Sequence, residues 1–176
     1  NPSQILMACK KVLDTKQISS NKLIKDFLDF IKKIQTKNYN NLDINDWKTL
    51  FHELCEWSLK IDEINNVDFK KILEDEKDII NNNFSKYIPE IYKYWLDNKD
   101  DRPILSSDIF SKCLKPIIDN KKLIFIIIDC FRLDQWKQIS SLFKDNYEIK
   151  EDIHVSILPT ATPFARNSIF SGLMPL

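Results

Sequence analysis

The fold class is indicated by one apolar run, Lys121-Lys-Leu-Ile-Phe-Ile-Ile-Ile-Asp129. The run shows no alternation of apolar and polar residues, which favours a strand buried on both faces, as in a mostly parallel sheet. It ends in the carboxylate of Asp129. Because ligands of open α/β sheets bind beyond the carboxyl ends of the strands, an aspartate at this point is a candidate metal ligand.

The segments that follow alternate between helix and strand patterns. Residues 132–143 carry apolar side chains at helical spacing, and residues 153–157 alternate between apolar and polar until Pro159. The predicted order is therefore strand, helix, strand, helix. A right-handed crossover between the two strands would set Asp129 and Thr162 near the same edge of the sheet.

A second motif, Leu158-Pro-Thr-Ala-Thr-Pro-Phe-Ala-Arg-Asn-Ser-Ile-Phe-Ser-Gly-Leu-Met-Pro175, predicts a helix from Pro163 to about Ser171. Proline is favoured at a first helical position, which makes Thr162 the expected N-cap, and Gly172 suits a left-handed C-terminal cap. The free N–H groups and the dipole at this helix start would form an anion site, so a bound phosphate would lie against Thr162 Oγ. On this motif alone, an ordinary structural cap is the alternative interpretation.

Two further polar residues of this helix are candidates for contact with such a phosphate. Arg166 lies one helical turn past Thr162 on the same face, and its guanidinium could return toward the helix start. A solvated helix arginine is the alternative. Asn167 is a weaker candidate. Asp134, in the predicted helix over 132–143, could orient the loop of Asp129, but the dipole alone favours an aspartate in the first turn of a helix.

The chain before residue 105 is predicted to be helical. A first helix is expected at Asn1 with Pro2 at its first position, and apolar side chains recur every three to four positions over 20–34, 44–57 and 69–95. Pro89 is expected to kink or split the last of these, and one more short helix is expected over 107–118, bent or ended near Pro116. Aromatic side chains at helical spacing are predicted to form the core of a helical bundle rather than a base-stacking platform: Trp47, Phe51, Trp57, Phe84, Tyr87 and Trp95.

Composition narrows the functional class. The 176 residues allow one or two domains, and 26 Lys+Arg balance 26 Asp+Glu, so neither a nucleic-acid nor a membrane surface is indicated as the main partner. No DNA-binding motif is present, and no apolar stretch approaches the roughly 18 residues that span a bilayer. The four cysteines show no metal-ligand spacing and are predicted to be reduced core thiols of a cytoplasmic protein: Cys9, Cys55, Cys113 and Cys130.

The two motifs together, Ile-Ile-Ile-Asp-Cys-Phe-Arg-Leu-Asp-Gln-Trp over 126–136 and the stretch 156–175, resemble the start of a PglZ domain, a branch of the alkaline phosphatase superfamily. They are most similar to those of PorX-type response regulators. The opening Asn1-Pro-Ser-Gln-Ile-Leu6 is similar to the point where the receiver domain of those regulators enters its last helix. The resemblance implies a mixed fold: the last receiver helix over 1–15, an all-α helical linker bundle over 16–105, and the N-terminal part of an α/β alkaline-phosphatase-like domain over 106–176.

The resemblance also implies the chemistry of the site. Proteins of this superfamily hold two divalent metal ions, usually zinc, and Asp129 matches the aspartate that ligates one of them. Thr162 matches the nucleophile, whose hydroxyl also contacts the metal ions. Thr160 is the less favoured candidate for the nucleophile. The remaining metal ligands would lie beyond Leu176 and the phosphorylation site before Asn1, so the chain resembles the middle of a longer protein and is expected to be catalytically incomplete alone.

At the level of function, the resemblance implies a two-component response regulator whose effector is a metal-dependent phosphodiesterase or phosphatase. Its substrate would be a phosphate ester or a nucleotide, and a sensor histidine kinase would be its partner through the receiver domain. A homodimer and a link to type IX secretion are also implied. The alternative is a non-catalytic signalling module that binds a nucleotide or a partner on a degenerate scaffold of the same fold.

Overall fold

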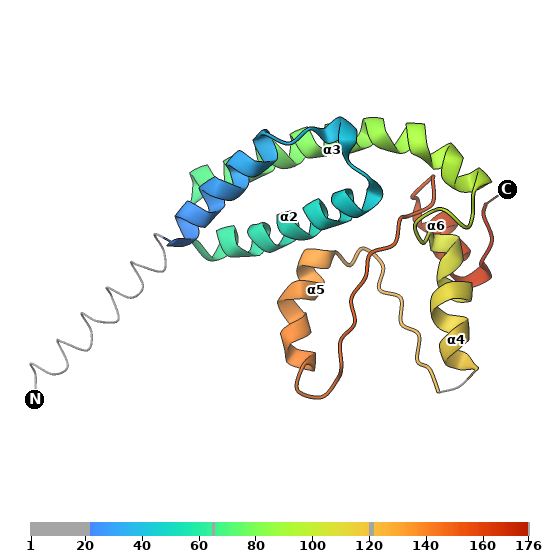
Figure 1. The fold of residues 1–176 in the computed structure, drawn as a ribbon. Helices are drawn as coiled ribbons and strands as arrows, with labels where there is room; N and C mark the ends of the chain where they lie inside the picture. The colour runs from blue at the N-terminus through green and yellow to red at the C-terminus, as the bar shows by residue number, and fades with distance from the viewer. Residues whose placement is uncertain (1–21, 65, 120–121, 176) are drawn as a thin grey trace, which may run out of the picture. The chain divides into compact units, whose positions relative to one another are not determined.

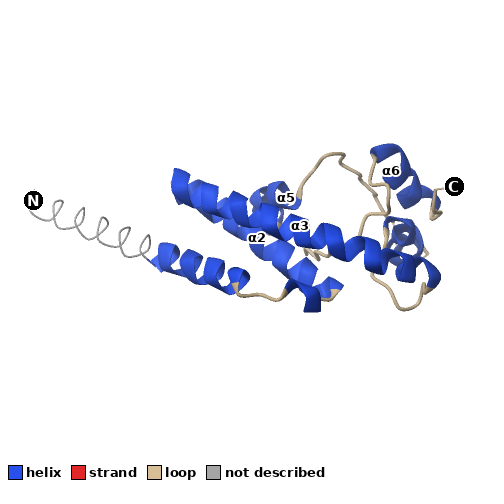
Figure 2. Ribbon diagram, turned by 90° about the horizontal axis from the view of Figure 1, so that it is seen from above, coloured by secondary structure: helices blue, strands red, loops and turns tan. Residues whose placement is uncertain are grey.

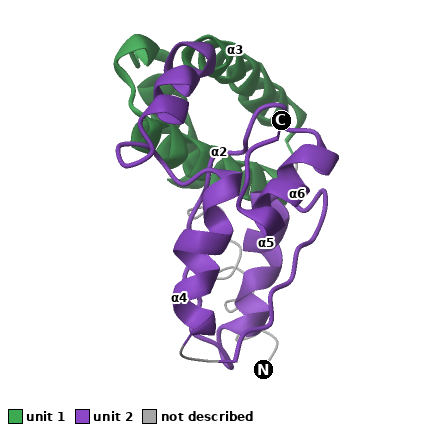
Figure 3. Ribbon diagram, turned by 90° about the vertical axis from the view of Figure 1, so that its right-hand side faces the viewer, with its two compact units in different colours: residues 1–87 green, residues 88–176 purple. Residues whose placement is uncertain are grey.

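The computed structural model describes residues 22–64, 66–119 and 122–175, so the first helix, the segment 1–15 and Cys9 lie outside the described residues (Figure 1). The described residues form helices and loops (Figure 2). The chain divides into two compact units, residues 1–87 and residues 88–176 (Figure 3). The predicted domain boundaries at residues 15 and 105 stay predictions.

The described part of the first unit is built from the helix over 22–35, α2 (Ile44–Ile64) and the first turns of α3 (Val67–Asp97). Figure 1 shows α2 running antiparallel to the other two. The connection before α2 contains η1 (Tyr39–Asn41). Asp43 caps α2, because its Oδ1 accepts the N–H groups of Asn45 and Asp46 at 2.8 and 2.9 Å. Asn66 caps α3 in the same way through the N–H of Asp68, at 2.9 Å.

The apolar faces of these helices form one core. Its buried members are Phe27, Phe30, Ile31, Ile34, Trp47, Leu50, Leu54, Trp57, Ile61, Leu73 and Ile80. Trp47 and Trp57 confirm the predicted bundle core, and Phe84 and Tyr87 pack against it. Two members of the aromatic set were predicted wrongly: Phe51 is 48% exposed, and Trp95 belongs to the second unit. Phe51 follows the buried Leu50 directly, which turns it about 100° away from the core face.

A polar contact also joins two of these helices. Gln35 donates from Nε2 to Glu76 Oε1, and the Glu76 residue is only 6% exposed. The contact joins the helix over 22–35 to α3 and supplies the partner that a buried carboxylate requires.

Pro89 does not split α3, which is continuous over Val67–Asp97. A proline in a helix removes one backbone hydrogen bond and crowds one carbonyl, and the turns on either side can hold the helix together. The expected split is therefore wrong, and the expected kink at Pro89 stays a prediction. The boundary between the two units falls at Tyr87, two residues before the proline, so the last turns of α3 belong to the second unit.

The described residues of the second unit form six short helical elements after α3. They are η2 (Ser106–Asp108), η3 (Ile109–Leu114), α4 (Lys115–Ile118), α5 (Leu133–Ser140), η4 (Ser141–Phe143) and α6 (Thr162–Ser171). The predicted helix over 132–143 is confirmed by α5 and η4. The predicted helix over 107–118 is present in three pieces of 3-10, π and α geometry, and the change to α geometry at Lys115 comes just before Pro116.

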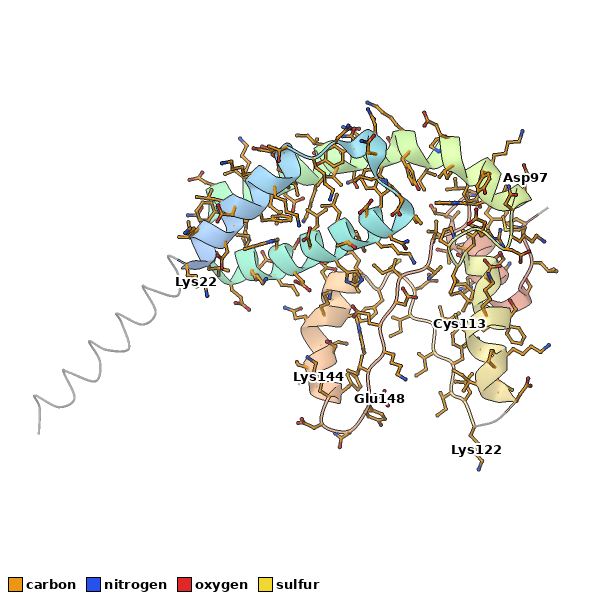
Figure 4. All side chains as sticks on the ribbon, in the orientation of Figure 1. Lys22, Asp97, Cys113, Lys122, Lys144 and Glu148 are labelled. Carbon is orange, nitrogen blue, oxygen red and sulfur yellow. The ribbon has the colours of Figure 1, made fainter. Side chains whose placement is uncertain are left out.

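The predicted strands over 121–129 and 153–157 are wrong, because no strand forms among the residues that the structure describes. A single parallel bridge joins Leu105 to Val155, with the Val155 N–H donating to Ile104 O at 2.9 Å. A strand needs a neighbour for its N–H and C=O groups, and the apolar run has no such neighbour within the described ranges. It runs extended after Lys122 (Figure 4), with Ile124 86% and Ile126 72% exposed. The α/β architecture stays a prediction.

The core of the second unit is small and contains a buried ion pair. Its apolar members are Tyr92, Trp95, Leu105, Leu114 and Ile157. Arg102, whose side chain is 3% exposed, donates from Nη2 to Asp108 Oδ1 at 2.8 Å. Asp108 also accepts the N–H of Leu105 at 2.9 Å. Each oxygen of the buried Asp108 carboxylate therefore has a partner, as a buried charge requires. The two bonds also fix the turn between α3 and η2.

The cysteines divide by exposure. The three that the structure describes form no disulfide: Cys55 is buried, Cys113 is partly buried and Cys130 is exposed. The core prediction is confirmed for Cys55 and wrong for Cys130. None of the helices among the described residues is long and apolar enough to cross a membrane.

Candidate active site

Thr162 is the first residue of α6 and not its cap. The preceding Ala161 has φ −59° and ψ 138°, and its carbonyl oxygen accepts the N–H groups of Phe164 and Ala165, both at 3.0 Å. Ala161 is therefore the N-cap residue, and its methyl side chain cannot accept a hydrogen bond. The prediction that Thr162 caps the helix is wrong, because the helix begins one residue earlier and places Pro163 at the second helical position.

This start leaves few donors for an anion. Pro163 has no N–H, and the N–H of Phe164 already donates to Ala161 O. At the first three positions of this described helix, only the N–H of Thr162 remains. A phosphate at the start of α6 would thus depend on side chains more than the sequence pattern suggests.

The other end of α6 follows the prediction. Gly172 adopts φ 69°, the left-handed region, and its N–H donates to Ser168 O at 2.9 Å. Ser168 is 2% exposed, and its hydroxyl donates to Leu173 O. This buried side of the helix packs against η2 and η3, whereas Thr162 and Arg166 are exposed.

An ion pair joins α6 to the end of the apolar run. Arg166 Nη1 lies 3.5 Å from Asp129 Oδ2, and both side chains are about half exposed. The rings of Phe125 and Phe170 meet edge to face, with centroids 5.7 Å apart. The run thus contacts α6 at two points, and Asp129 reaches the helix one turn after Thr162. Asp129 thus contacts α6 through Arg166 without a sheet, and its predicted nearness to Thr162 stays a prediction.

The turn after Asp129 leads directly into α5. Cys130 has φ 57°, a left-handed conformation that is uncommon for a residue with a β-carbon. At the start of α5, the Arg132 N–H donates to Gln135 Oε1 at 3.0 Å. The Arg132 guanidinium contacts both oxygens of Asp134, at 3.0 and 2.9 Å. The hydrogen bond from Arg132 is the main cause that lowers the pKa of Asp134, so this carboxylate is engaged at the start of α5.

Of the five predicted site residues, the structure brings two into contact, Asp129 and Arg166. Thr160, Thr162 and Asn167 are exposed. Among the described residues, no group of three or more His, Cys, Asp or Glu could hold a metal ion. Asp129 offers one carboxylate, which faces a guanidinium, so these residues do not by themselves make a two-metal site.

Two hydroxyl groups near this site carry no signal in the sequence. The Leu158 N–H donates to the hydroxyl oxygen of Tyr92 at 2.9 Å, and the Ile157 N–H donates to Ser106 Oγ at 3.3 Å. The peptide bond between Leu158 and Pro159 is cis. These bonds hold the backbone that leads into the Thr160 and Thr162 motif.

The chain was compared with families of known proteins. Residues 17–96 match the PorX response regulator linker domain, and residues 109–176 match the BREX system PglZ alkaline phosphatase-like domain. The chain is therefore similar to a PorX-type linker over its first part and to a PglZ domain over its second. Asp129 and α6 both lie within the PglZ match, and the helical core of the first unit lies within the linker match. The resemblance to PorX-type regulators with a PglZ domain is confirmed, and a comparison with the curated proteins found no match.

Proposed function

We propose that this chain belongs to a response regulator whose effector is a metal-dependent phosphodiesterase or phosphatase of the PglZ type. The observation that carries the proposal is the contact of Asp129 with Arg166, one turn along α6 from Thr162. The hydroxyl of Thr162 and the guanidinium of Arg166 lie on α6, and the carboxylate of Asp129 contacts Arg166 from the turn that ends the apolar run; these are groups that phosphoryl transfer uses.

Each residue has a role in this proposal. The Thr162 Oγ attacks phosphorus in line with the leaving ester oxygen, so the Thr–O–P bond forms as the P–O bond of the ester breaks. The hydroxyl proton passes to solvent, and the leaving oxygen takes up a proton. Water then hydrolyses the phosphothreonine and restores the hydroxyl. Arg166 donates hydrogen bonds to the non-bridging phosphoryl oxygens, and Asn167 and Thr160 are weaker candidates for contact with substrate.

Asp129 is proposed as one ligand of a site for two zinc ions, with Thr162 beside it and the other ligands outside the described residues. Metal ions bound there would lower the pKa of the attacking hydroxyl and stabilise the charge on the phosphoryl oxygens. The PglZ match supports this role of Asp129, since alkaline phosphatase-like domains use metals.

The linker match supports a signalling setting. We propose a phosphate ester or nucleotide as substrate, a sensor histidine kinase as partner, a homodimer as the assembly, the cytoplasm as the compartment and type IX secretion as the process served. The described cysteines Cys55, Cys113 and Cys130 form no disulfide, which agrees with a reducing compartment.

The decisive experiment compares Thr162→Ala, Thr162→Ser and Thr160→Ala in the protein that carries this chain, with bis(p-nitrophenyl) phosphate as substrate. Because Ala161 is the cap residue, Thr162→Ala removes no capping bond and should change the free energy of unfolding by less than about 0.5 kcal/mol. Turnover should fall by orders of magnitude in Thr162→Ala, while Thr162→Ser and Thr160→Ala keep measurable activity.

Full turnover in Thr162→Ala would end the assignment of the nucleophile. Equal and severe losses at Thr160 and Thr162 would mean that the nucleophile is not identified. If the wild type binds a nucleotide without hydrolysing any phosphate ester, the non-catalytic signalling module is the better description.

A further inference from the structure

We propose that Tyr92, near the C-terminal end of α3, is a positioning residue for the backbone segment that leads into α6. This inference rests on the proposed function, because it gives Tyr92 a task in the same site. The contact that carries it is the hydrogen bond from the Leu158 N–H to the Tyr92 hydroxyl oxygen, at 2.9 Å. Leu158 lies four residues before Thr162, the proposed nucleophile.

The ring of Tyr92 is itself held in place. Tyr92 is 9% exposed, and its ring meets Trp95 edge to face, with centroids 6.4 Å apart and planes at 73°. A buried tyrosine whose ring is fixed by packing presents its hydroxyl at a defined point. The hydroxyl therefore acts as a fixed acceptor for the passing backbone.

The backbone before α6 is held at further points in the same stretch. The Ile157 N–H donates to Ser106 Oγ at 3.3 Å, and the Val155 carbonyl accepts the Ser106 N–H at 3.1 Å. Ser106 and Ile157 are fully buried. Leu158, in contrast, is 41% exposed, so burial of its own side chain does not hold it. The Tyr92 hydroxyl is thus the last anchor before the exposed residues 159–162.

The two partners of this hydrogen bond fall in different family matches. Tyr92 lies within the PorX linker match, and Leu158 lies within the PglZ match. Both belong to the same compact unit, residues 88–176. The end of the linker helix is therefore a structural part of the effector, and the position of the proposed nucleophile depends on a linker side chain.

The test uses the full chain with Tyr92→Phe, which keeps the ring and removes the hydroxyl. Tyr94→Phe is the matched control, because Tyr94 lies on the same helix as Tyr92 and its hydroxyl donates to Asp101, an exposed residue after that helix, at 2.7 Å. Amide hydrogen exchange at Leu158 should become roughly three- to tenfold faster in Tyr92→Phe, the change expected for one lost hydrogen bond, and should stay unchanged in Tyr94→Phe. Ser106→Ala should speed exchange at Ile157 in the same way.

Equal exchange in Tyr92→Phe and wild type would overturn the proposal. Faster exchange throughout residues 88–175, together with a lower melting temperature, would also overturn it, because it would show a general loss of stability.

A kinetic measurement in the protein that carries this chain separates this inference from the proposed function. Tyr92→Phe should lower kcat for bis(p-nitrophenyl) phosphate several-fold with KM unchanged, and an unchanged kcat would deny the hydroxyl a role in the reaction. If Thr162→Ala keeps full turnover while exchange at Leu158 responds to Tyr92→Phe, the proposed function fails and the anchoring by Tyr92 stands.

Discussion

The Arg166 guanidinium lies 3.5 Å from the Asp129 carboxylate and connects α6 to the turn that ends the apolar run. The two residues are far apart in the sequence, and both side chains remain about half exposed. An exposed ion pair contributes little to stability. Its position beside Thr162 is therefore of more interest for chemistry than for folding.

Replacement of Arg166 should separate its effect on stability from its effect on turnover. Arg166→Gln should change the free energy of unfolding by less than about 1 kcal/mol, because the pair is half exposed. Turnover of bis(p-nitrophenyl) phosphate should fall by about tenfold or more, since a hydrogen bond to a charged group is lost. Arg132→Gln is the control, because Arg132 pairs with Asp134 at the start of α5. Equal turnover in both variants would remove Arg166 from the site.

Replacement of Asp129 should affect metal content. Asp129→Asn should lower the zinc retained after dialysis by the protein that carries this chain, because a neutral amide lacks the charge that a divalent cation prefers. Atomic absorption gives the stoichiometry. Asp145→Asn, at an exposed turn position, should retain the wild-type content. An Asp129→Asn protein with unchanged stoichiometry and affinity would show that Asp129 is not a ligand.

Two neighbouring residues of α2 test the core of the first unit. Leu50 is 1% exposed and Phe51 is 48% exposed. Leu50→Ala should lower the free energy of unfolding by about 2–5 kcal/mol, because it leaves a cavity among packed side chains. Phe51→Ala should cost less than about 1 kcal/mol. Urea denaturation of the two variants measures the difference, and similar midpoints would contradict the observed orientation of α2.

Asp134 should give a measurable dependence on pH. The hydrogen bond from Arg132 lowers the pKa of this carboxyl, so its contribution to stability is complete above the ordinary aspartate pKa of about 3.9. The contribution is lost as pH falls through the lower pKa of the folded state. In Arg132→Gln, NMR titration should show the Asp134 pKa shifted up toward the ordinary value. A pKa that does not move would assign the shift to other groups.

The helices of the first unit were predictable because their signal is local. Apolar residues at every third or fourth position place Trp47, Leu50 and Leu54 on one face of α2, and such faces pack together. The end of α6 at Gly172 was equally readable, since a glycine after an apolar pattern suits a left-handed cap. The start of α6 was missed by one residue, because proline is tolerated at either of the first two helical positions.

The strands and part of the site could not be predicted in this way. A strand depends on hydrogen bonds to residues distant in the sequence, so an apolar run such as 123–128 shows only that a partner would be favourable. The approach of Asp129 to α6 was expected from a crossover between strands, but it occurs through the Arg166 and Phe170 contacts. Tyr92 lies in a helical apolar pattern. Such a pattern does not distinguish a tyrosine whose hydroxyl forms a hydrogen bond from one that only packs.

The left-handed cap of α6 has a consequence for mutational tolerance. A β-carbon at Gly172 would lie 3.7 Å from Ser107 O, an ordinary contact, so the pocket has room for alanine. The obstacle is the torsion angle, since φ +69° costs about 1–2 kcal/mol for most L-residues. Asparagine, the residue that bears this angle best after glycine, differs from every glycine codon at two or more bases. Most substitutions of Gly172 that a single base change can produce should therefore strain this turn. Among them, aspartate should be the least destabilising.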